Sequence, residues 1–178
     1  MKCSIVDIHT HRPTRKALEP SFAGIHPWQA ETRGIEEIVP LSLVGSEMCI
    51  RDRDYAGTVG REAQLRIFRE QLDWAERLGK PVVLHCVKAF EAVMRELAPH
   101  ALRAVIFHGF IGSSQQAAEA IKKGYYLSFG ERTFRSPRTV EALRRTPVEN
   151  LFAETDESDV PIEEIYRRIA QAKDLDPE

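Results

Sequence analysis

Paired cysteines are missing from this sequence. Its 178 residues include three cysteines, Cys3, Cys49 and Cys86, and no two of them have the spacing of a CxxC motif. An odd number of widely spaced cysteines argues against a disulfide framework and against a zinc ribbon. We therefore interpret the three as small buried residues or inert thiols.

An excess of positive charge is also missing. The 25 Lys and Arg residues stand against 27 Asp and Glu residues, which gives a formal net charge of −2. Because sequence-independent DNA binding usually needs a strongly basic surface, any contact with a polyanion must depend on local arginines or on bound cations. The arginines that can form a local cluster are Arg132, Arg135, Arg138, Arg144 and Arg145. We interpret them first as a solvated helix face, with guidance of a nucleic-acid backbone as the alternative.

Long hydrophobic runs are absent as well. No uninterrupted apolar stretch approaches the roughly 20 residues that a membrane-spanning helix needs. The N-terminal residues do not show a basic segment followed by an apolar one, which is the pattern of a secretory signal peptide. We therefore expect a cytosolic protein without membrane contact, and a monomer is the favoured assembly.

From residue 61 onward the sequence alternates helical and strand patterns. Residues 61–79 place apolar side chains three and four positions apart and end at Gly79, which predicts an amphipathic helix. Further helices are expected over 89–98, from a cap at Ser113 or Ser114 to Gly124, over 136–145 and over 161–172. Short apolar runs over 81–86, 102–110, 125–130 and 149–157 predict strands. This order is typical of parallel strands buried on both faces.

The fold class expected from this alternation is α/β, a TIM-like (β/α) barrel in one domain over residues 1–178. About seven strands can be counted, and the length lies below the roughly 200 residues of a complete eight-fold barrel. The barrel is therefore expected to be incomplete or distorted. The first third of the chain is the least regular part.

Polar residues stand at the carboxyl ends of the predicted strands. Five of the six histidines occupy such positions, and His100 is the exception. Residues 4–11, SIVDIHTH, predict a further strand that ends in His9 and His11, and the other strand-end residues are His26, His85, His108 and Asp156. In a (β/α) barrel all these ends lie on one face, so the side chains are expected to converge. For any single histidine, a buried imidazole bonded to a carbonyl is the alternative, and Asp156 could instead cap the helix after Pro161.

Imidazoles and a carboxylate around an open position are the ligands that a hydrolytic divalent metal needs. Such a metal acidifies a water molecule, and two ions about 3.5–4 Å apart can hold both the attacking and the leaving oxygen. The set therefore predicts a site for one or two divalent ions.

Five segments, VDIHTH, GIHPW, VVLHCV, VIFHGF and LFAETD, occur in this order and resemble the TatD family of metal-dependent hydrolases. The resemblance implies that His9 and His11 hold a first ion, Mg²⁺, Mn²⁺ or Zn²⁺, and that His85 and His108 hold a second. It implies that Asp156 is both a ligand of the first ion and the catalytic residue for the attacking water. His26 and Lys88 are implied to bind substrate, and Asp7 to orient an imidazole.

One part of the family pattern is missing. The family has a glutamate in a GEIGLD-like strand that bridges both ions, whereas residues 41–54 of this chain read LSLVGSEMCIRDRD. Glu47 is the acid nearest to the expected position, and its flanking residues differ from the pattern, so it is a weak candidate for the bridging ligand. The stretch also resembles translated adapter sequence, which makes residues 41–53 a candidate non-native insert.

Three functions remain open at this level. The resemblance implies phosphodiester hydrolysis of the TatD deoxyribonuclease type, with DNA or a small phosphodiester as substrate. The same metal centre can also hydrolyse an amide, ester or lactone, since related barrels host such reactions. The departure at residues 41–54 motivates the third, a catalytically impaired binding module or defective product.

Overall fold

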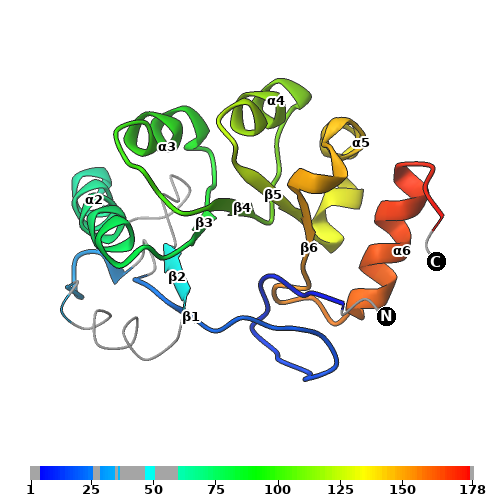
Figure 1. Ribbon diagram of the computed structural model, residues 1–178, viewed down its shortest axis with the longest axis horizontal. Helices are drawn as coiled ribbons and strands as arrows, with labels where there is room; N and C mark the ends of the chain where they lie inside the picture. The colour runs from blue at the N-terminus through cyan, green and yellow to red at the C-terminus, as the bar shows by residue number, and fades with distance from the viewer. Residues whose placement is uncertain (1–4, 26–28, 35, 37–46, 51–59, 177–178) are drawn as a thin grey trace. The chain divides into compact units, whose positions relative to one another are not determined.

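The computed structural model of the protein describes residues 5–25, 29–34, 36, 47–50 and 60–176 (Figure 1). The chain divides into two compact units. One consists of Ser21–Phe107 and is called the central unit below; the other combines Met1–Pro20 with His108–Glu178 and is called the terminal unit. The expectation of a single domain over residues 1–178 stays a prediction.

The central unit has parallel strands with helices between them. Its elements are β1 (Phe22–Ala23), β2 (Glu47–Ile50), α2 (Arg61–Leu78), β3 (Val82–His85), α3 (Phe90–Leu97) and β4 (Val105–His108), whose last residue belongs to the terminal unit. Strand β2 pairs in parallel with β1 and with β3, and Met48 lies opposite Val82. The candidate insert therefore includes a strand, because Glu47–Ile50 lies between β1 and β3; residues 41–46 and 51–53 lie outside the described residues.

Helix α2 confirms the helix predicted over 61–79. Its apolar stripe buries Ile67, Phe68, Leu72 and Ala75. Gly79 ends the helix in the left-handed conformation, with φ of 60°, and its N–H donates to the last helical carbonyls. A residue without Cβ adopts this conformation at little steric cost, which explains why the helix stops there.

The terminal unit repeats the alternation. Its elements are α4 (Ser114–Lys122), β5 (Tyr126–Phe129), the 3₁₀ helix η3 (Glu131–Arg135), α5 (Pro137–Arg145), the 3₁₀ helix η4 (Val148–Asn150), β6 (Leu151–Ala153) and α6 (Ile162–Ala172). Strands β5 and β6 are parallel, with Ser128 opposite Phe152. Helix α4 contacts β5 and helix α6 contacts β6, while α5 lies against both α4 and α6 (Figure 1).

The helix starts predicted at Ser113 and at Ser136 are confirmed. Ser113 caps α4 through a reciprocal pair of bonds, in which its hydroxyl accepts from the N–H of Gln116 and its own N–H donates to the Gln116 side chain. Ser136 caps α5 by accepting from the N–H of Thr139, with Pro137 at the first helical position. Both caps satisfy backbone donors that have no partner within a helix.

Replacing Ser113 by Ala should lower the free energy of unfolding by about 1 kcal/mol, because the N–H of Gln116 loses its acceptor. Urea denaturation followed by circular dichroism measures this loss. Ser114→Ala is the matched control: Ser114 is the first residue of the helix itself, so this change should be nearly neutral. Equal effects of the two substitutions would contradict the role of the cap.

The N-terminal segment differs from its prediction. The sequence suggests a strand over residues 4–11, whereas the structure has isolated parallel bridges, Val6 to Leu18 and Thr10 to Asp156. The described residues accordingly form six strands instead of about seven. Hydrogen bonds join this segment to Leu18 and to Ala153 and Asp156, and each pairing is limited to a single bridge.

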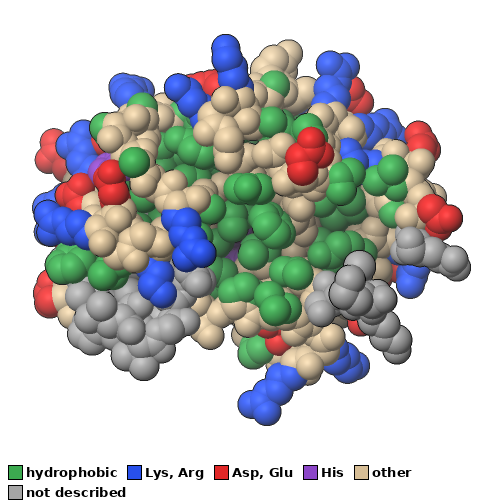
Figure 2. Space-filling view, viewed as in Figure 1, with side chains coloured by type: hydrophobic (Ala, Val, Ile, Leu, Met, Phe, Trp, Pro, Cys, Tyr) green, Lys and Arg blue, Asp and Glu red, His purple; other side chains and the backbone are tan. Residues whose placement is uncertain are grey.

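The surface agrees with the balanced composition. On the face shown in Figure 2, basic and acidic side chains of the described residues are interspersed, without a continuous field of one sign. None of the described helices is both long and apolar enough to cross a membrane.

Candidate metal centre

Backbone pairing brings the N-terminal segment beside the residues that follow β6. Ile8 donates to the carbonyl of Ala153 over 3.1 Å, Asp156 donates to that of His9 over 2.9 Å, and His11 donates to that of Asp156 over 2.9 Å. These bonds run in parallel register on either side of the Thr10–Asp156 bridge. As a result, the two histidines of SIVDIHTH lie directly beside Asp156, within the terminal unit.

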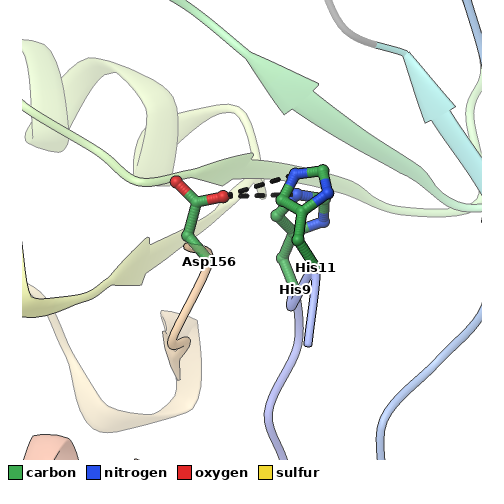
Figure 3. Close-up of side chains that lie close together, drawn as sticks. All are labelled: His9, His11 and Asp156. Carbon is green, nitrogen blue, oxygen red and sulfur yellow. Dashed lines mark ion pairs between the residues drawn. The ribbon is translucent and has the colours of Figure 1, made fainter. Parts of the chain in front are cut away.

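The two imidazoles converge on one carboxylate oxygen. The Nε2 atoms of His11 and His9 lie 3.5 and 3.8 Å from Oδ1 of Asp156 (Figure 3). Their rings are almost perpendicular, with centroids 5.1 Å apart. The His9 side chain is 4% exposed and that of His11 35% exposed, so the group has one buried and one accessible side. The structure confirms the predicted proximity of His9, His11 and Asp156.

A second group of donors shares Asp156. His108, at the end of β4, lies with Glu154 and Asp156 so that one donor atom of each is within 4.8 Å of the others. The rings of His9 and His108 are 4.1 Å apart, which makes the two groups neighbours. Neutral imidazoles suit Zn²⁺ and carboxylates suit Mg²⁺ and Mn²⁺, and both kinds of donor are present here. These residues fit a divalent metal.

Glu154 was missed as a site residue in the sequence. It is 1% exposed, accepts a hydrogen bond of 2.6 Å from the Ser128 hydroxyl and lies 3.4 Å from Nδ1 of His108. Burial raises the pKa of its carboxyl, while the charge of His9 and the hydrogen bonds from Ser128 and the Gly109 N–H act in the opposite direction. In the sequence, the position of Glu154 directly after a predicted buried strand could have indicated that it is a site residue.

Burial also raises the pKa of the Asp156 carboxyl, and the negative charge of Glu154 raises it further. His108 and His11 oppose this rise. Each of these two carboxylates makes the ionised form of the other less favourable. A cation bound between them would stabilise both ionised forms.

Asp7 supports the loop that carries Asp156. Its carboxylate accepts from the N–H of Thr155 over 3.0 Å and from the Thr155 hydroxyl over 2.7 Å. Burial raises the pKa of Asp7, and these bonds from Thr155 lower it. Asp7 therefore acts on Asp156 through the neighbouring threonine.

The backbone at Asp156 is unusual for a residue with a side chain. Its φ is 53°, in the left-handed region that aspartate tolerates better than most residues. The alternative role as a cap of α6 is not borne out, since Pro161 occupies the N-cap and no side chain caps that helix. The side chain is directed at the histidines instead (Figure 3).

Comparison with known proteins identifies the family. Residues 15–174 match the family described as TatD related DNase. The chain belongs to this family. It is 33% identical over 147 residues to a putative deoxyribonuclease TATDN1 homolog of Encephalitozoon cuniculi, covering 80% of this chain and 52% of that protein. It is 31% identical over 137 residues to the uncharacterized metal-dependent hydrolase YjjV of Escherichia coli, covering 75% and 51%.

Structural comparison supports the same conclusion for the fold of this TatD family member. The crystal structure of a hydrolase TatD family protein from Entamoeba histolytica matches with a TM-score of 0.76 at 16% identity, covering 91% of this chain and 70% of that one. This confirms the predicted α/β fold class with TIM-like parallel strands. The chain spans about half the length of the two relatives named above.

Other residues expected from the family pattern lie in the central unit. His85 ends β3 and is half-buried, while Lys88 is exposed with a φ of 54°. Glu47 begins β2, and only its backbone is described; His26 lies outside the described residues. The roles of these four stay predictions.

His100, the histidine excluded from the site, has a structural role. Its Nδ1 lies 2.8 Å from the Glu76 carboxylate, which also accepts from the N–H of Ala101 over 2.9 Å. These bonds join α2 to the segment after α3.

Proposed function

We propose that the protein is a divalent-metal-dependent hydrolase that cleaves phosphodiester bonds in DNA. The observation that carries the proposal is the convergence of His9, His11 and His108 with two carboxylates in a member of the TatD related DNase family. The family description and the names of the relatives point to DNA as the substrate. Single-stranded DNA or a small phosphodiester is the substrate class proposed here, with action in the cytosol as a monomer.

Two of the chain's donor groups would hold the cation. His9 and His11 offer Nε2 atoms and Asp156 offers Oδ1, while His108 and Glu154 extend the same cluster. When bound, a divalent ion supplies positive charge that polarises a phosphoryl oxygen and acidifies water. With several imidazoles in the set, Zn²⁺ fits better than Mg²⁺.

Asp156 would handle the proton of the attacking water. Its side chain is 24% exposed and lines a cavity, so a water molecule can reach it from solvent. Its carboxylate oxygens lie beside His9 and His11, where a water held by the cation would be within reach. The roles that the TatD resemblance implies for His85 as a metal ligand, and for Lys88 and His26 as substrate-binding residues, stay part of the proposal.

Metal-dependent turnover is the test. The purified chain, stripped with EDTA, should cleave an end-labelled single-stranded oligonucleotide only after Mg²⁺, Mn²⁺ or Zn²⁺ is added, and chelation should stop the reaction again. A p-nitrophenyl carboxylic ester serves as the substrate control. Cleavage that persists in EDTA would contradict the metal-dependent mechanism.

The remaining outcomes separate the alternatives. Metal-dependent cleavage of the ester without cleavage of DNA would favour amide, ester or lactone hydrolysis. Binding of metal without turnover of either substrate would favour an impaired product. In that case, activity gained by grafting a GE-x-GLD strand over residues 41–54 would identify the missing glutamate as the cause.

A further inference from the structure

A cavity of about 180 Å³ opens beside the donor groups, within the terminal unit. Asp156 and Glu154 line it together with Gly109, Ile111, Arg132 and Ser158. Pockets that enclose drug-sized ligands measure roughly 300–1,000 Å³, so this cavity has room for one small unit of a longer molecule.

Arg132 is the cation of this cavity that remains available. The neighbouring Arg135 lies 2.6 Å from the Glu131 carboxylate, whose second oxygen accepts from the Ser158 hydroxyl over 2.7 Å. Arg132 is exposed, and it makes no ion pair with any residue in the described part of the chain. Its guanidinium can therefore bind an external anion without losing a partner there.

The charges around the cavity determine which ligand it accepts. Glu131, whose carboxylate is paired with Arg135, lines the cavity with Glu154, Asp156 and Glu157, so the lining is acidic and disfavours an anion in the metal-free protein. A divalent cation bound at the donor groups would offset the negative charge of Glu154 and Asp156, and Arg132 adds a positive charge to the lining. An anion with several acceptor oxygens then becomes the complementary ligand.

Ile111 adds an apolar surface to the same cavity. Its side chain is 54% exposed, although a branched aliphatic residue is usually buried. A ligand that combines an anionic group with a less polar ring can use both features, and the phosphate and sugar of a nucleotide have this combination.

We propose that the cavity is the subsite for the nucleotide next to the scissile bond, with Arg132 donating to its phosphate oxygens and Ile111 packing against its sugar. This rests on the proposed function for the choice of a nucleic acid. Arginine suits the role because its planar guanidinium can donate two parallel hydrogen bonds to phosphate.

The first test measures nucleotide binding without catalysis. Isothermal titration of Mn²⁺-loaded protein with thymidine 5′-monophosphate is expected to give a Kd about tenfold weaker for Arg132→Ala than for the native chain, because a charged hydrogen bond is lost. Arg132→Lys keeps the charge and should recover part of the affinity. Arg138→Ala is the matched control: Arg138 is exposed on α5 and contacts Gln116, so its Kd should not change. An unchanged Kd for Arg132→Ala, or no binding by the native chain, would overturn the subsite.

The second test separates this inference from the proposed function. In single-stranded DNA cleavage, Arg132→Ala should raise KM more than it lowers kcat. The slope of log KM against log salt concentration should fall by about one, as expected for the loss of one phosphate contact. If the native chain binds the nucleotide through Arg132 but cleaves no DNA, the proposed function fails, while the cavity stands as a nucleotide-binding site. If it cleaves DNA and Arg132→Ala matches it in KM and in nucleotide affinity, the subsite fails and the function stands.

Discussion

Asp156→Asn should lower the affinity of the protein for Mn²⁺ or Zn²⁺ by more than about a hundredfold and remove metal-dependent turnover. Loss of a supporting residue around a metal ligand already costs roughly 10–100-fold. Asp156 belongs to both donor groups, so its replacement weakens each of them. The amide keeps the size of the side chain but loses the negative charge that lies 3.5 Å from His11. Isothermal titration with the metal and cleavage of labelled single-stranded DNA measure the two effects.

Asp159→Asn provides the matched control for this change. Asp159 lies on the same loop, its side chain is 88% exposed, and it pairs with Arg12 outside the donor groups. Its variant should bind metal as the native chain does. Far-ultraviolet circular dichroism should show the same helical content in both variants. If Asp156→Asn retains native metal affinity, the candidate metal centre is misplaced.

Glu154→Ala should reduce the free energy of unfolding by about 3 kcal/mol. The change removes the acceptor of the Ser128 hydroxyl and of the Gly109 N–H in a fully buried place, and it leaves a cavity. A buried polar group that loses its partner costs about 1–3 kcal/mol, and the lost packing adds to that. Glu154→Gln, which keeps the volume and one acceptor oxygen, should cost about 1 kcal/mol. Urea denaturation of the metal-free protein measures both values.

The control for the Glu154 substitutions is Glu157, an exposed residue on the same loop. Glu157→Ala should leave stability within about 0.5 kcal/mol of the native value, because Glu157 is solvated. If the two alanine variants have equal free energies of unfolding, the buried hydrogen bonds of Glu154 contribute nothing to stability.

Local patterns allowed most of the regular elements to be predicted. The helix ends at Gly79, Ser113 and Ser136 depend on residues within a few positions, and the structure has each of them. The grouping of His9, His11 and Asp156 could be predicted for a different reason. The carboxyl ends of parallel strands meet at one edge, so polar residues at those ends converge even when they are far apart in the sequence.

The features that were not predicted depend on tertiary contacts. The N-terminal segment alternates apolar and polar residues like a strand, but its partner changes from Leu18 to Asp156 along its length. Glu154 gains its role from complete burial beside Ser128 and His108, and neither neighbour is near it in the sequence. An acid at a strand end looks the same in the sequence whether it is buried or solvated.

The bonds between Asp7 and Thr155 join residues 148 positions apart. During synthesis, the early histidines must therefore wait until the residues after β6 have been made before Asp156 can lie beside them. Contacts between residues so far apart in the sequence form slowly, which makes ion loading a late event in folding. A ribosome-bound intermediate that lacks β6 and the residues after it would have neither Glu154 nor Asp156 to offer a cation, so uptake of metal would report that this segment has paired with the early histidines.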